Sequence, residues 1–385
     1  MAETGARLVI GNAVLVLPDR VVPGGLAVEN GLIAEVFEGP APGAALDGAL
    51  DWGGDLLAPG LVELHTDSLE HHLLPRPGVE WPHDQAIIAH DAVLAGCGIT
   101  TVFDALRVGS ITRQAHYRAY ARKVASEINA LADAGALRIN HLLHLRAEIC
   151  SETLAEELAG FTPRDRVRLV SIMDHTPGQR QFRDPRQYAR WFTTGKGVDE
   201  AALAAHIAMM MDVRARHGEG HEAAILAAAA RLGAVLASHD DTTEAEVAAS
   251  AAHGARIAEF PTTFEAARAC RAHGIATMAG APNLIRGGSH SGNVAAGELA
   301  EAGLLDILSS DYVPASLLSG AMRLAALWGD LPRALACVTA SPARAAGLAD
   351  RGRLAPGLRA DLIRLVRQGG LAILRETWVG GKRVA

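Results

Sequence analysis

His65 and Asp67 stand two residues apart at the end of an apolar, β-rich run that follows a Pro59-Gly60 turn. Side chains alternate across a β-strand, so these two point to the same side and can bind one ion. An imidazole and a carboxylate together suit zinc, iron or manganese. The pair therefore predicts a metal-binding site at the end of a first strand.

Further imidazoles and carboxylates end later β-like runs. They are Glu148, which follows Arg146, then His175 after Asp174, His239 before Asp240 and Asp241, and finally Asp311. Barrel enzymes place their chemistry at the carboxyl ends of the strands, and a bridging carboxylate can hold two ions about 3.5–4 Å apart. The set predicts a centre of one or two divalent ions, with zinc expected first and manganese or iron as alternatives.

Each of these residues also has a structural interpretation. A single strand-end histidine is more often a hydrogen-bonded structural residue than a ligand, Glu148 could pair with Arg146, and Asp240 and Asp241 could cap the next helix. Because potential ligands occur at several strand ends at once, a metal site explains them better than a separate structural role for each residue. Structural roles are expected for the other histidines near it: His71, His72, His83, His90, His141 and His144.

The runs that carry these residues alternate with Ala-rich helical stretches. Strands are expected at 61–66, 99–104, 139–147, 168–174, 234–239, 256–260, 275–279 and 306–310. Eight strands that alternate with helices predict an α/β fold. We expect a (β/α)8 TIM-like barrel of the metal-dependent hydrolase type over residues 59–345.

The two ends of the chain show short strands broken by Asn-Gly, Pro-Gly and Gly-Gly turns. We expect residues 1–58 and 346–385 to form one composite β-sandwich domain. The interval from about 176 to 233 is longer than a single barrel helix needs. Insertions between barrel strands usually lie over the active-site mouth, so this interval is a candidate lid.

Composition argues against several classes of function. A net charge of −7 and a pI near 6.1 do not fit a nucleic-acid-binding protein, which needs a basic face. The four cysteines are far apart and form no CxxC pair, which favours a reducing compartment. No apolar run approaches the ~18 residues of a membrane span. We therefore expect a soluble, cytoplasmic homo-oligomer, a dimer or larger, without nucleic-acid or membrane partners.

With these residues in place, the chain resembles the amidohydrolase superfamily over nearly its whole length. The first-strand motif of that superfamily is His-x-His, whereas this chain has His-x-Asp, which narrows the subfamily. The resemblance implies that one ion is held by His175 and His239 and the other by His65 and Asp67, with Glu148 bridging. It also implies that Asp311, at the last strand, orients the attacking water and accepts its proton.

Longer strings narrow the resemblance further. They are 63–70, 98–105, 173–182 and 281–293. Together they resemble a diphosphatase branch of the superfamily that acts in phosphonate catabolism, in the carbon–phosphorus lyase pathway. This resemblance implies that a phosphorylated sugar, a ribose 5-triphosphate with methylphosphonate on C1, is hydrolysed to its 5-phosphate and pyrophosphate. Magnesium is expected to accompany the triphosphate.

A triphosphate substrate needs positive charge and backbone donors. The Gly-rich loop from Arg286 to Asn293 follows the seventh predicted strand, where barrels often bind phosphate. A flexible connection is the alternative interpretation of this loop. Arginine forks bind phosphate oxygens in pairs. Our candidate substrate-binding residues are Arg286, Ser289, His290, Asn293, Arg180, Arg183 and Arg76, with Lys196 and Arg107 as weaker candidates.

Two other functions remain open from the sequence. A cyclic amidase or deacetylase would use the same metals with a neutral or singly anionic pocket, and the arginine-bearing loop argues against it. A non-catalytic scaffold protein of the same lineage would typically have lost its metal ligands, whereas here they are present at five predicted strands.

Overall fold

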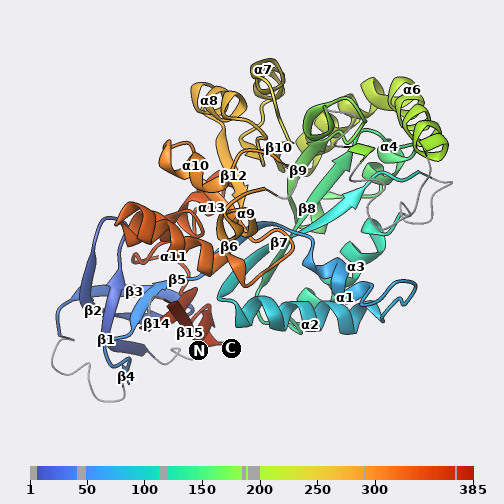
Figure 1. The fold of residues 1–385 in the computed structure, drawn as a ribbon. Helices are drawn as coiled ribbons and strands as arrows, with labels where there is room; N and C mark the ends of the chain where they lie inside the picture. Colours follow the sequence, from blue (N-terminus) through green and yellow to red (C-terminus); the bar gives the residue numbers. More distant parts are fainter. Residues whose placement is uncertain are drawn as a thin grey trace.

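The computed structural model describes residues 7–40, 49–111, 119–183, 188–189, 200–289, 292–368 and 371–385. Two eight-stranded sheets organise these residues. One sheet carries the candidate site, and the other is made from both ends of the chain (Figure 1).

The first sheet is the expected α/β barrel. Its eight parallel strands pair in sequence order. They are β6 (Leu61–Thr66), β7 (Ile99–Val108), β8 (Asn140–Glu148), β9 (Val167–Met173), β10 (Val235–His239), β11 (Ile257–Glu259), β12 (Ala276–Gly280) and β13 (Ile307–Ser309). Each of the eight predicted runs overlaps one of these strands, with ends that differ by at most four residues, so the barrel prediction is confirmed.

The seam between the first and last strands is held by the buried carboxylate of Glu63 on β6. It accepts hydrogen bonds from the Ser309 hydroxyl at 2.9 Å and from the backbone N–H of Ser310 at 2.5 Å. A parallel bridge also joins Thr66 to Asp311. These contacts bring the ends of β6 and β13 together and leave the barrel nearly closed.

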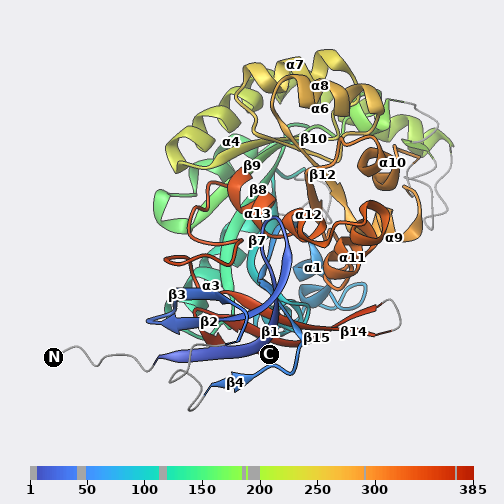
Figure 2. The ribbon, with the colours of Figure 1, turned by 90° about the vertical axis from the view of Figure 1, so that its left-hand side faces the viewer.

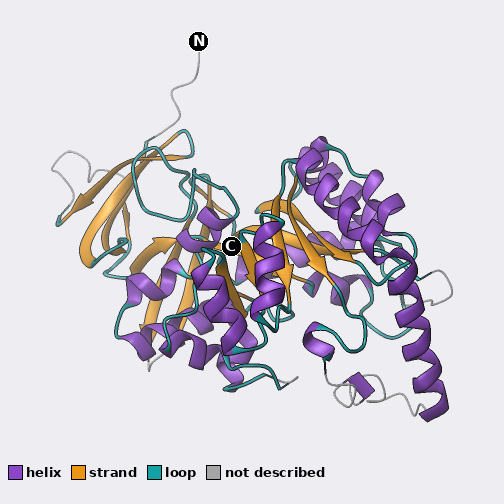
Figure 3. Ribbon diagram, turned by 90° about the horizontal axis from the view of Figure 1, so that it is seen from above, coloured by secondary structure: helices purple, strands orange, loops and turns teal. Residues whose placement is uncertain are grey.

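Helices cover the outside of the barrel (Figure 3). Those before β10 are α1 (Ser68–Leu73), α2 (His83–Gly96), α3 (Ala121–Asp133), α4 (Leu154–Ala159), η3 (Pro163–Asp165), η4 (Arg180–Phe182) and α6 (Glu200–Leu232). Those after β10 are α7 (Glu244–Ala252), α8 (Phe264–Ala272), α9 (Ala281–Arg286), α10 (Ala296–Glu301), α11 (Ser316–Trp328), α12 (Leu331–Ala336) and α13 (Ala340–Ala345). Every second residue of a strand points to the same side, and apolar residues such as Leu64, Phe103 and Met278 form one buried hydrophobic cluster of the barrel strands.

The cap of α7 corrects one structural interpretation made from the sequence. Thr243 is the N-cap residue, and it forms a reciprocal capping box with Glu246. Asp240 and Asp241 therefore do not cap this helix, and both side chains are available for other contacts.

The second sheet joins the two ends of the chain. Its strands are β1 (Leu8–Val16), β2 (Val21–Glu29), β3 (Leu32–Glu38), β4 (Leu50–Asp51), β5 (Leu56–Pro59), β14 (Leu362–Gln368), β15 (Leu371–Val379) and β16 (Lys382–Arg383). β5 pairs in parallel with β1 and antiparallel with β14. Blue and red strands accordingly lie side by side in Figure 2, which confirms the predicted union of the chain ends in one sheet.

Part of the predicted insertion reaches the barrel mouth. Phe182 in η4 and Met210 on α6 both line the cavity described below, while α6 runs away from the composite sheet (Figure 1). Residues 184–187 and 190–199, which include Lys196, lie outside the described residues, and the lid stays a prediction. Within the described part of the chain, no helix has the length and apolar character of a membrane span.

Candidate metal centre and active site

A cavity of about 780 Å³ opens at the carboxyl ends of the barrel strands. Residues from β6, β8 and β10 and from the turns after β9 and β13 converge on it. The predicted metal ligands that line it are His65, Asp67, Glu148, His175, His239 and Asp311. Side chains from distant parts of the sequence therefore meet as the strand-end rule predicts.

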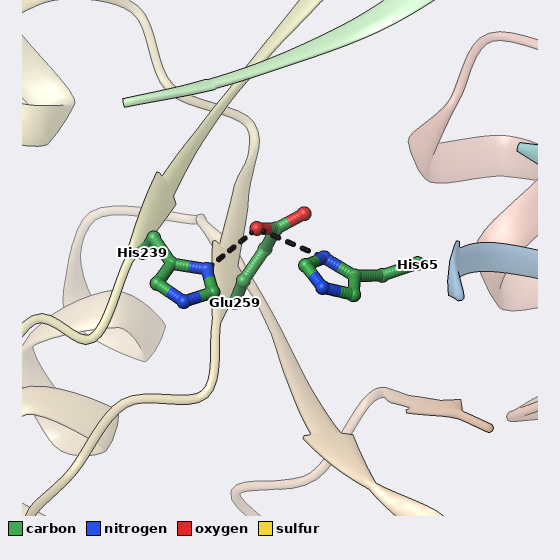
Figure 4. Close-up of side chains that lie close together, drawn as sticks. All are labelled: His65, His239 and Glu259. Carbon is green, nitrogen blue, oxygen red and sulfur yellow. Dashed lines mark hydrogen bonds and ion pairs between the residues drawn. The ribbon is translucent and has the colours of Figure 1, made fainter. Parts of the chain in front are cut away.

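Two of the histidines share one carboxylate. The Nδ1 atoms of His65 and His239 lie 3.3 Å and 2.9 Å from the same oxygen of Glu259, at the end of β11 (Figure 4). Burial lowers the pKa of both imidazoles to about 3, so both are neutral at pH 7. His239 Nδ1 forms a hydrogen bond with Glu259, and a proton on that nitrogen leaves the Nε2 lone pair of His239 available to a metal.

A second group of donors meets around Asp240. Its Oδ2 lies 3.4 Å from His239 Nε2 and 3.9 Å from His175 Nε2. One ligand atom from each of His175, His239 and Asp240 falls within 4.8 Å of the others. Two imidazoles and a carboxylate at this spacing can hold one divalent cation.

Asp240 and Asp311 owe their positions to unusual backbone conformations. Each follows a barrel strand, and each has a left-handed backbone, with φ of 57° and 54°. Such conformations are costly for residues other than glycine and cluster at functional sites. Burial raises the pKa of Asp240 to about 6 and, together with Asp67, that of Asp311 to about 7. A nearby cation would stabilise the charged form of both carboxylates.

Glu148 contacts His175 directly. Its Oε2 lies 2.5 Å from His175 Nδ1, and its Oε1 accepts hydrogen bonds from the backbone N–H groups of His175 and Cys150. Burial opposes ionisation, yet His175 holds the pKa of Glu148 below its ordinary value. In this geometry Glu148 orients His175, and a bridging role would require the His175 contact to break.

Asp67 has a free ligand atom. Its Oδ2 lies 3.3 Å from Arg146 NH1, while its Oδ1 is buried without a hydrogen-bond partner among the described residues. Burial of a carboxylate oxygen without a hydrogen-bond partner costs free energy, and binding of a cation to that oxygen would offset the cost. With the two donor groups above, this orphaned atom fits a divalent metal at the centre of the cavity.

The predicted substrate-binding residues separate into two groups. Arg286, at the end of α9, and Ser289 and Asn293, which follow it, line the cavity. His290 lies outside the described residues. The cavity lining does not include Arg76 and Arg183, which are exposed, or Arg180, which donates to the His239 carbonyl at 2.5 Å and to Asp241 at 2.8 Å.

Sequence reasoning missed Glu259, and it placed Asp240 at a strand end without choosing it as a metal ligand. Glu259 ends the sixth predicted strand, so the rule that found Glu148 would also have found it. Arg146 was considered only as a partner of Glu148, but it pairs with Asp67. No periodic pattern distinguishes a ligand from the carboxylate behind it, since both lie at strand ends.

Two of the histidines given structural roles, His90 and His141, belong to a buried chain of hydrogen bonds, whereas His71 lines the cavity. His90 Nδ1 lies 3.2 Å from the Ser68 hydroxyl, and His90 Nε2 lies 2.9 Å from Asp104. The other Asp104 oxygen lies 2.7 Å from His141 Nδ1. His141 continues to Asp91, which accepts from Arg138. This chain joins α1, the helix after Asp67, to β7 and β8.

Comparisons with known proteins agree with this geometry. A sequence model described as the amidohydrolase family matches residues 57–384. The chain is 43% identical over 380 residues to an alpha-D-ribose 1-methylphosphonate 5-triphosphate diphosphatase from Escherichia coli (strain K12), covering 98% of this chain and 100% of that protein. It is 25% identical over 369 residues to an imidazolonepropionase from Deinococcus deserti, covering 87% and 85% of the two chains. A solved structure of 5-methylcytosine deaminase from Klebsiella pneumoniae matches with a TM-score of 0.63 at 18% identity, covering 99% and 98%, which shows a common fold.

Proposed function

The chain belongs to the amidohydrolase family, and we propose that it hydrolyses α-D-ribose 1-methylphosphonate 5-triphosphate to the 5-phosphate and pyrophosphate. The observation that carries this proposal is the 43% identity to the Escherichia coli diphosphatase, which extends over the full length of that relative. The convergence of histidines, carboxylates and arginines on one cavity supports it, because metal ligands and guanidinium groups can together neutralise the charge of a phosphoric anhydride during hydrolysis.

We propose that the metal is zinc, in one or two ions, with manganese or iron as alternatives and magnesium accompanying the triphosphate. His175, His239 and Asp240 would hold one ion. His65 and Asp67 would contribute to a second. When bound, the metal supplies an electrophile that neutralises phosphoryl charge and lowers the pKa of a bound water.

The side chains of this chain have distinct tasks in the proposed reaction. Asp311 holds the attacking water and accepts one of its protons. The water oxygen forms a bond to the α-phosphorus, the bond from that phosphorus to the α–β bridging oxygen breaks, and the bridging oxygen leaves with pyrophosphate. Glu259 and Glu148 hold the imidazoles in the orientation that keeps their Nε2 lone pairs in the cavity.

Arg286, Ser289 and Asn293 are our proposed contacts for the anionic groups of the substrate. They carry a guanidinium, a hydroxyl and an amide at the cavity wall, all of which donate hydrogen bonds to phosphate or phosphonate oxygens. We also propose that the protein is cytoplasmic and that it forms a homo-oligomer. Light scattering of the purified protein tests the oligomeric state.

The test is hydrolysis of the ribose 1-methylphosphonate 5-triphosphate by metal-reconstituted protein in ¹⁸O-enriched water, with products resolved by phosphorus NMR. We expect pyrophosphate and a 5-monophosphate that carries the heavy oxygen. Removal of metal by a chelator should abolish turnover, and its return should restore it. No cleavage by protein that contains stoichiometric metal would overturn the proposal and favour an amide-bond hydrolase.

A further inference from the structure

Two arginines stand at the same level on neighbouring strands. Arg107 on β7 is the register partner of Arg146 on β8, and both line the cavity. Side chains of paired residues in a parallel sheet point to the same face. Like charges directly opposite each other repel, so an anion placed between the two guanidinium groups would be attracted by both.

The hydrogen bonds of Arg146 leave most of its donors for another partner. Its side chain is only 17% exposed, and among the described residues its guanidinium donates one hydrogen bond, of 3.3 Å, to Asp67. Its Nε is buried without a hydrogen-bond partner among the described residues. A guanidinium has five N–H donors in a fork that matches phosphate oxygens, and an unpaired buried donor is costly.

Arg107 contacts the loop after its own strand and an aromatic ring. Its NH1 donates to the carbonyl oxygen of Gly109 at 2.8 Å, and its guanidinium lies 5.7 Å from the centre of the Tyr120 ring. The Tyr120 hydroxyl in turn donates to Glu70, which also lines the cavity. These contacts fix Arg107 against the wall next to Arg146.

This arginine pair lies on the opposite side of the barrel from Arg286. The strand order places β8 four strands away from β12, after which Arg286 follows, in a barrel of eight. The proposed metal-binding donors on β6, β10 and the turn after β13 lie between the two cationic regions. The cavity therefore has a buried cationic end and a more exposed one.

Resting on the proposed function, we propose that Arg107 and Arg146 form the subsite for the departing pyrophosphate, whereas Arg286 faces the methylphosphonate. Pyrophosphate has the higher charge of the two groups, and two adjacent guanidinium forks can bind its oxygens in pairs. Negative charge grows on the bridging oxygen as the anhydride bond breaks, and fixed cations stabilise that charge without reorganisation.

The experiment measures the binding of inorganic pyrophosphate and, separately, of methylphosphonate by calorimetry. The proteins are the metal-loaded wild type, Arg146→Gln, Arg107→Gln, Arg286→Gln and the matched control Arg216→Gln. Arg216 is exposed on α6 and pairs with Asp212. We expect Arg146→Gln and Arg107→Gln to weaken pyrophosphate binding at least tenfold and to leave methylphosphonate binding within twofold of wild type. Arg286→Gln should show the reverse, and the control should match wild type.

Metal content is measured for every variant, and Arg107→Gln keeps the test decisive if Arg146→Gln does not fold. Pyrophosphate binding at wild-type strength in the arginine variants, or equal loss of both ligands, overturns the subsite. A wild type that binds pyrophosphate through Arg146 but does not cleave the triphosphate leaves the subsite standing and removes the proposed function. If the wild type cleaves the triphosphate and Arg146→Gln turns it over equally fast, the proposed function stands and the pyrophosphate subsite is overturned.

Discussion

The hydroxyl of Thr66 donates a 2.7 Å hydrogen bond to the carbonyl oxygen of Asp311, across 245 positions of sequence. Thr66 ends the first barrel strand and precedes Asp67, whereas Asp311 follows the last strand. The bond therefore holds two cavity carboxylates next to each other at the seam. Their proximity is one reason, after burial, that the pKa of Asp311 rises to about 7.

Replacement of Asp311 by Asn should remove the proton acceptor and keep the shape of the site. Asn tolerates the left-handed backbone found at this position. We expect kcat to fall by roughly 10²–10⁴, the usual contribution of a general base, while metal content by atomic emission stays close to wild type. Turnover at the wild-type rate would remove Asp311 from the mechanism.

Replacement of Glu259 by Gln should weaken metal binding, although Glu259 is itself not exposed to the cavity. Its carboxylate forms a hydrogen bond with His239 Nδ1 and lies 3.3 Å from His65 Nδ1. Loss of such a carboxylate typically costs about 10–100-fold in metal affinity or activity. Competition with a chromophoric chelator measures the affinity, and Glu265→Gln, at an exposed position on α8, is the control. Equal affinities in the two variants would contradict the orienting role.

Replacement of Arg180 by Gln should act on stability more than on substrate binding. Arg180 is the ion-pair partner of Asp241, whose side chain is fully buried. Removal of one partner from a buried pair typically costs about 3–5 kcal/mol. We expect the urea midpoint to fall and KM to stay near wild type. The double variant Arg180→Gln/Asp241→Asn should recover part of the loss, because no carboxylate is then left unpaired. A raised KM at unchanged stability would instead support the predicted phosphate contact.

The buried histidine chain predicts a dependence of stability on pH. Burial alone would lower the pKa of His141, but Asp104 and Asp91 more than offset it and raise the pKa to about 9. The unfolded value is near 6.5, so the folded state binds the extra proton between these values. This contribution is fully present below pH 6.5 and is lost as the pH rises towards 9.

Urea denaturation at pH 6, 7.5 and 9 measures this effect. We expect wild-type stability to fall by roughly 1–3 kcal/mol over the interval, since one pKa unit corresponds to about 1.4 kcal/mol. His141→Gln should be less stable at pH 6 and should flatten the curve. His253→Gln, on the surface next to Glu222, is the control and should retain the wild-type slope. A variant curve parallel to wild type would contradict the proposed ion pair.

The barrel was predictable because its strands carry apolar runs and its helices carry Ala-rich ones. All eight predicted strands exist, and the predicted ligands meet in one cavity, because parallel strands bring their carboxyl ends to one edge. Strand-end position alone thus located His65, His175 and Asp311 without any knowledge of their contacts.

The sequence could not predict in the same way which side chains face the cavity and which are paired with other residues. Arg180 was predicted to bind phosphate and Arg146 was not, yet Arg180 is bound to Asp241 and Arg146 lines the cavity. This difference depends on side-chain direction and on partners far along the chain. Likewise, the sequence did not reveal the left-handed backbone of Asp240, whose carboxylate lies beside His239 and not at the cap of the next helix.

The pairing of β5 between β1 and β14 has a consequence for the order of folding during synthesis. Leu56–Pro59 is buried along its whole length, but one of its two partners lies beyond the entire barrel in sequence. Chains fold as they emerge, N-terminal segments first. All eight barrel strands are therefore synthesised before β14, and until then β5 presents an open edge. Open apolar edges recruit other chains. The nascent protein is therefore most prone to aggregation late in translation, after its catalytic half has already formed.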